Sequence, residues 1–304
     1  MVTIDELMRV LLGPLLVATF LSLLGRWRKW AWIMPLAFGA AFLTGYSLIG
    51  IPKLPPRDGT DWLYWVMVPA TVWGILDALL GSGKELGWFR GMSSWVVGGI
   101  VGGICIGGAS VIIILPLARV GGTPNSTQCW QLGVAIGAAG AVMIWLLGWA
   151  QRRLGTLTVI AGLWITLGAT AVMVMSSNLR IVGVYGLAAA AALAPLALFM
   201  GKVPAVRSVT MLALALLSAE LVSGHYYADP GVTWTHALVL GLAPLGLVLA
   251  TLVPGKHGWV RAIVGLLLVS VAVATVTVPA ALAAKKAAED GGDTESMYSS
   301  PAGR

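Results

Sequence analysis

The chain has 304 residues, of which 58% are hydrophobic and only 10% are charged, and its mean hydropathy is +0.90. Soluble domains carry roughly 25% charged residues, so this composition excludes a soluble fold and predicts an integral membrane protein. The net charge of +7 is explained by membrane topology and contact with anionic lipid, and we expect membrane lipids as partners and no nucleic acid.

Taken in chain order, the apolar runs predict an all-α, polytopic transmembrane helix bundle of about ten spans with short loops, forming one membrane domain over residues 1–284. The expected spans are 7–24, 31–51, 62–80, 94–117, 131–150, 154–175, 181–200, 208–222, 234–253 and 262–284. The eighth is the shortest and the easiest to miscount. From residue 285 the chain turns polar, which predicts a disordered tail over 285–304.

The distribution of Lys and Arg predicts the orientation. If the loop after the first span is cytoplasmic, loops on that side carry eleven Lys and Arg residues, and the other internal loops carry four. The positive-inside rule then places both termini outside the cytoplasm. We expect a cell membrane, specifically the bacterial cytoplasmic membrane.

Ten spans divide into five plus five, and an odd number of spans per half would make the two halves inverted repeats, as in many transporters. Under that division the third and eighth spans correspond. Each carries one acidic residue, Asp77 and Glu220 respectively. Among the predicted spans, these two side chains are the candidate sites for ion or proton binding.

An acid at lipid depth is costly, by about 2.5–3.5 kcal/mol on insertion scales, so it is a functional hypothesis by default. Asp77 or Glu220 could bind a cation or carry a proton, with the other acid or His225 in a relay. The structural alternative is that both acids lie near the interface and reach water or a neighbouring Lys or Arg.

The fourth span contains glycines at a helical spacing, which predicts close helix packing without any chemistry of its own. These packing glycines are Gly98, Gly99, Gly102, Gly103 and Gly107.

No catalytic, cofactor or metal motif stands out, and we expect no cofactor. Cys105 and Cys129 suggest neither a disulfide framework nor a metal site. The polar segment around His225 and Asp229 is the weaker candidate, a site at the membrane rim. An enzyme is therefore the less favoured class.

Three function classes follow. The favoured one is a small-solute or ion permease or exporter. The second is a non-catalytic structural or assembly subunit, with a second copy or other membrane subunits as partners, and the third is a membrane enzyme acting on a lipid-type substrate. In length and span count the chain resembles the drug/metabolite exporter superfamily, although no motif accompanies the resemblance and the predicted outside termini depart from it.

Overall fold

The computed structural model describes residues 4–50, 56, 61–82, 94–119, 124–177, 179–199, 206–229, 231–254 and 258–298, and within these ranges it contains helices and no strand. The helices are α1 (Ile4–Arg28), α2 (Ile33–Ile49), α3 (Asp61–Ser82), α4 (Ser94–Arg119), α5 (Ser126–Leu154), α6 (Thr156–Ser176), α7 (Arg180–Phe199), α8 (Val206–Tyr227), α9 (Trp234–Leu242), α10 (Leu245–Ala250) and α11 (Gly258–Tyr298).

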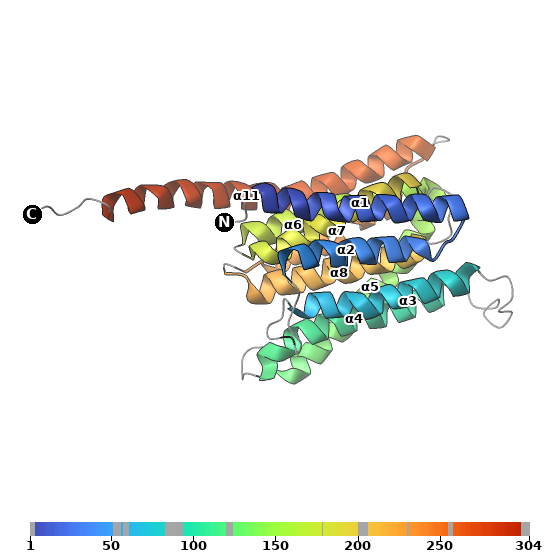
Figure 1. Cartoon of the computed structure of the whole chain (residues 1–304), viewed down its shortest axis with the longest axis horizontal. Coiled ribbons are helices and arrows are strands. Elements are labelled where there is room, and N and C mark those ends of the chain that lie inside the picture. The colour runs from blue at the N-terminus through green and yellow to red at the C-terminus, as the bar shows by residue number, and fades with distance from the viewer. Residues whose placement is uncertain are drawn as a thin grey trace, which may run out of the picture.

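The helices run side by side along one direction (Figure 1). Eight of them are long and apolar enough to cross a membrane, and α2 is a shorter apolar helix of 17 residues. The predicted all-α transmembrane bundle is therefore confirmed, and the chain is a multi-pass membrane protein.

The last three predicted spans differ from the observed helices in length or continuity. The eighth is not short, because α8 continues through the polar, aromatic residues up to Tyr227. The ninth consists of α9 and α10, which are separated at Ala243 and Pro244 because proline has no N–H to continue the helix. The tenth extends to Tyr298 as part of α11, where the sequence predicts a disordered tail from residue 285.

Local capping explains the boundaries of α5. Its N-cap, Asn125, accepts a hydrogen bond from the backbone N–H of Gln128, and the Gln128 side chain accepts one from the Asn125 N–H. This capping box starts the helix five residues before the predicted span. At the other end Gly155 has φ +87°, a conformation that favours glycine, and allows α6 to begin directly after the turn.

The most buried helix is α8. Of its most apolar stretch 89% is buried, against 39% for α3, its counterpart under the predicted five-plus-five division. Helix α8 packs against α3, α4, α6 and α7, whereas α3 packs mainly against α2 and α8. Helix α8 is therefore more deeply buried than the helix that would correspond to it in inverted halves.

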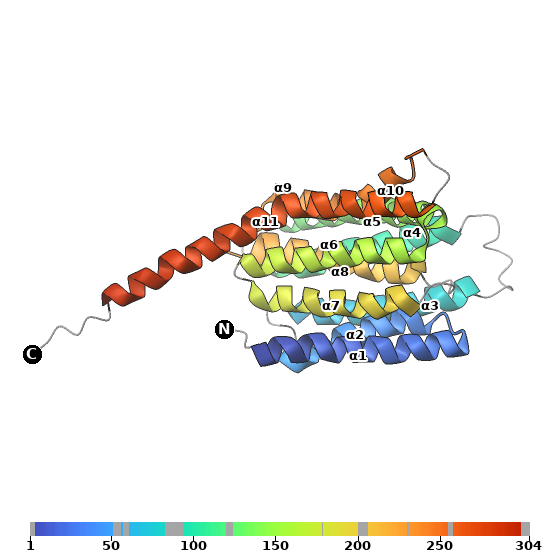
Figure 2. The same ribbon diagram turned by 90° about the horizontal axis from the view of Figure 1, so that it is seen from above.

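Figure 2 shows α1 and α2 at one edge of the bundle and α11 with α9 and α10 at the other, and the corresponding helix pairs are in contact. The start of α1 and the end of α11 lie at the same end of the bundle, as an even number of crossings requires (Figure 2). The 41 residues of α11 span about 60 Å, roughly twice the thickness of a hydrocarbon core, so this helix projects well beyond its neighbours (Figures 1 and 2).

Candidate functional site

Glu220 lies in the interior of α8 and is fully buried, with an exposed fraction of 0%. It is 14 residues after the start of α8 and 7 before its end, or about 20 Å and 10 Å along the helix axis. The sequence predicts this acid about one turn from the end of a short span. Because α8 is longer than predicted, the carboxyl group lies two turns inside the bundle.

The Glu220 carboxylate lies against the backbone of α7. A Cβ built on Gly186 would be 2.7 Å from both carboxylate oxygens and 2.8 Å from the Cβ of Ala171 on α6. Only a glycine leaves space here for the acid. The carboxyl group thus occupies the place where α6, α7 and α8 meet.

Neither oxygen of Glu220 has a hydrogen-bond partner within the part of the chain that the structure describes. One turn further along α8, the hydroxyl of Ser223 is also fully buried and unpartnered there. Across the described part of the chain, no three His, Cys, Asp or Glu side chains come together in a way that could hold a metal ion. Unpartnered polar atoms at this depth are expensive, so Glu220 is the strongest candidate for a functional group.

Asp77 has a different environment, because it forms an ion pair with Arg207 near the start of α8. The Nε of Arg207 donates a hydrogen bond of 3.0 Å to Oδ2 of Asp77, its Nη2 contacts Oδ1, and the hydroxyl of Ser208 donates to Oδ2 at 2.7 Å. For Asp77 the structure therefore shows the structural alternative, in which the acid reaches a neighbouring basic residue. The interaction ties α3 to α8.

The two candidate acids do not come together. Arg207, the partner of Asp77, is 13 residues from Glu220 on the same helix, a separation of about 20 Å along the axis. A direct proton relay between Asp77 and Glu220 is incompatible with this spacing.

The rim candidates are held by local contacts. His225 lies in the last turn of α8, where its Nδ1 is 2.7 Å from the backbone oxygen of Val232 and its ring packs against those of Tyr226 and Trp234. Asp229 follows the helix and is exposed. Because the imidazole is engaged with backbone and aromatic rings, the arrangement resembles an interfacial aromatic cluster more than a catalytic pair.

The five glycines singled out in the fourth span all lie at helix contacts. A Cβ on Gly103 would be 2.5 Å from the backbone oxygen of Gly137 on α5, and Gly107 meets Gly133 in the same way. Gly98 instead leaves space for the side chain of Arg207, because a Cβ built on it would be 2.7 Å from the Nε of that residue. The remaining two contact α5 or α8 side chains or backbone, and are Gly99 and Gly102.

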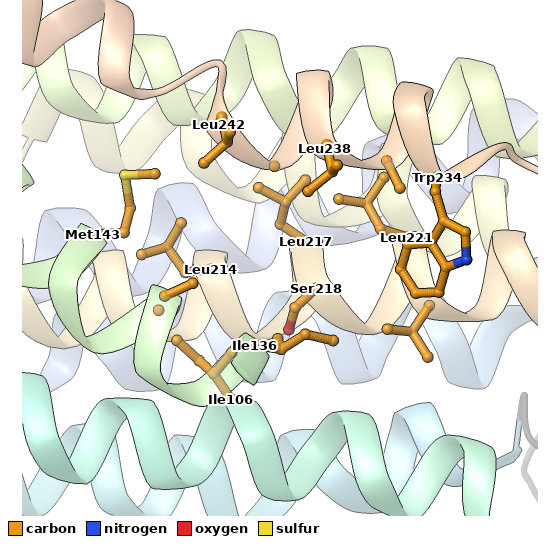
Figure 3. Close-up of a pocket in the computed structure, with 15 residues that line it drawn as sticks. Ile106, Ile136, Met143, Leu214, Leu217, Ser218, Leu221, Trp234, Leu238 and Leu242 are labelled. Atoms are coloured by element: carbon orange, nitrogen blue, oxygen red, sulfur yellow. The ribbon is translucent and has the colours of Figure 1, made fainter. Parts of the chain in front are cut away.

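A cavity of about 170 Å³ lies on the face of α8 that points away from Glu220 (Figure 3). It was not predicted from the sequence. Its wall is formed mainly by apolar side chains of α4, α5, α8 and α9, and the polar groups among these side chains are the hydroxyl of Ser218 and the indole N–H of Trp234 (Figure 3). The sequence gives no signal for it, because these residues resemble any other lipid-facing or core positions. Helix α9 packs against α8 and α11 beside the cavity, and beyond the break at Pro244 α10 packs against α11 and α5.

Comparison with known proteins gives no match: no family model, no curated protein and no solved structure matches this chain significantly. The resemblance in length and span count noted above therefore carries no argument about activity. The site has to be interpreted from its own residues.

Proposed function

We propose that the protein is a permease or exporter for a small solute or ion, and that Glu220 is the proton-binding group that drives it. The observation that carries this proposal is the fully buried carboxyl group without a hydrogen-bond partner in the described residues. A glutamine or leucine would serve a purely structural role at lower cost, because a carboxylate left without a partner at this depth destabilises the fold.

A proton fits the environment better than a metal cation. Hard cations such as Mg²⁺ and Ca²⁺ take six or more oxygen ligands, whereas in the described residues the Glu220 oxygens have no hydrogen-bond partner and no group of three His, Cys, Asp or Glu side chains could hold a metal ion. A proton needs only the carboxyl group itself. The closed packing around Glu220 corresponds to an occluded state of the carrier.

The contacts of α8 indicate which surfaces must separate to open that state. Near one end α8 is tied to α3 by the Asp77–Arg207 pair, and at the other the hydroxyl of Tyr227 donates a 2.7 Å hydrogen bond to the backbone oxygen of Ile113 on α4. The Glu220 face meets α6 and α7 through small residues instead. We therefore expect α6 and α7 to move relative to α8, α3 and α4.

The test uses the full-length protein in liposomes that contain a pH-sensitive dye, under an imposed pH gradient. A panel of small cations, anions and neutral solutes is added in turn, and solute-dependent proton flux is recorded. We expect at least one solute to give flux, and Glu220→Gln to abolish it while leaving the stability of the protein unchanged or raised, since it removes a buried acid. Asp229→Asn is the control, because it removes an exposed acid that follows the same helix and should retain flux.

A panel without any solute-driven flux, or normal flux in Glu220→Gln, would contradict the proposal. The alternative is then a non-catalytic assembly subunit. The feature that favours this alternative is the apolar flank where α4 and α5 cross, around the glycine contacts. There Ile104 and Val134 are each 69% exposed and Trp130 is 60% exposed. A second copy or another membrane subunit would be its partner.

A further inference from the structure

We propose that the cavity between α4, α5, α8 and α9 is a binding site for one acyl chain of a membrane lipid. Figure 3 shows Trp234, Leu238 and Leu242 of α9 along one side, Ile106 and Ile136 opposite, and residues of α8 between them. This site is on the other face of α8 from Glu220, so the inference is independent of the proposed transport function.

The wall of the cavity selects for hydrocarbon. The hydroxyl of Ser218 donates its proton to the backbone oxygen of Ala215 at 2.9 Å, so that donor is already used within the helix, and the indole N–H of Trp234 lies at one end of the cavity (Figure 3). A polar solute that entered would exchange its water for few hydrogen bonds, which is unfavourable. An alkyl chain has no such requirement.

The depth of the cavity matches one leaflet. From Trp234 to Leu242 is about 12 Å along α9, close to half of the roughly 30 Å hydrocarbon core. The Trp234 end adjoins the rings of His225 and Tyr226, whose polar edges suit the headgroup region, and the other end is close to the Pro244 break. A lipid headgroup would lie at this aromatic cluster, with its chain directed along α9.

The cavity is continuous with the lipid-facing surface. On its α9 side Leu238 is 60% exposed, Leu242 47% and Trp234 42%, so in a bilayer the surrounding medium reaches these residues. Its volume is close to that of an engineered apolar cavity of about 150 Å³ that takes up benzene, and it is too small for a helix about 10–12 Å wide. Both comparisons favour a chain over a partner helix.

The test places the full-length protein in nanodiscs that contain phosphatidylcholine with a photoreactive diazirine on one acyl chain. After illumination, the sites of lipid attachment are located by mass spectrometry. We expect attachment to concentrate on the cavity residues of α8 and α9. Ala139→Phe, which fills the cavity from the exposed position on α5, should reduce that attachment several-fold.

Two further variants keep this test decisive. Gly241→Leu fills the cavity from α9, where a Cβ would have ordinary contact at 3.6 Å with Leu221, and should give the same loss if Ala139→Phe does not fold. Val142→Phe makes a similar change on α5 at a 55% exposed position outside the cavity, and should leave labelling unchanged. Attachment spread evenly over the lipid-facing surface, no response to either filling variant, or crosslinks to a second copy in the cavity would each overturn the proposal.

Discussion

The two buried acids show how different the roles of similar residues can be. Both occur in predicted spans of comparable hydropathy, and the sequence suggests the same hypothesis for each. In the structure Asp77 has a guanidinium and a hydroxyl as partners, whereas neither carboxylate oxygen of Glu220 has a hydrogen-bond partner among the described residues. The partners of Asp77 are 130 and 131 positions away along the chain, and a single sequence does not pair them with this acid.

The Asp77–Arg207 pair is expected to be a major source of stability. Asp77→Asn should lower the free energy of unfolding by about 3 kcal/mol, because removing one member of a buried ion pair leaves the other charge without its partner. Unfolding of the variant in detergent, followed by circular dichroism, gives this value.

A double variant separates this effect from general disruption. Arg207→Met keeps the side-chain stem that packs on Gly98 and removes the charge. The double variant Asp77→Asn with Arg207→Met should therefore lose less free energy of unfolding than the sum of the losses in the two single variants. Additive losses would show that the two residues do not interact.

Among the helices, the prediction succeeded where apolar length alone decides the outcome. Ten apolar runs were expected, and each corresponds to a helix or, for the ninth, to α9 and α10. The prediction was less accurate where polar residues continue a helix, as at the end of α8, or where one proline divides it, as at Pro244. These boundaries depend on tertiary contacts, such as the one from Tyr227 to α4, which hydropathy does not reveal.

The contact between α4 and α5 depends on the absence of side chains at specific positions. Gly103→Ala should lower the free energy of unfolding by about 1–3 kcal/mol, because the new methyl group would be 2.5 Å from a backbone oxygen that cannot rotate away. Gly108→Ala is the matched control: no atom lies within 4 Å of its Cβ, and the change should be neutral or stabilising by up to about 1 kcal/mol. Equal effects of the two changes on unfolding in detergent would show that the helices do not approach at Gly103.

At the level of the whole molecule, the start of α1 and the end of α11 lie at one end of the bundle (Figure 2), and the charge distribution predicts that this end is outside the cytoplasm. A phosphatase that is active only outside the cytoplasm should therefore be active when fused after residue 304. A fluorescent protein that matures only inside should be bright when inserted between residues 83 and 93. The opposite pattern would reverse the predicted orientation.

The central position of α8 has a consequence for biogenesis. Seven helices leave the ribosome before α8, and the space that α8 fills between them stays incomplete until it arrives. Its Arg207 and Glu220 make lone insertion of this segment costly, whereas the carboxylate of Asp77 on α3 is by then already in the bilayer and can receive the arginine. Entry of α8 into the membrane is thus expected to depend on α3, so that a defect in α3 would expose the nascent chain to quality-control proteases.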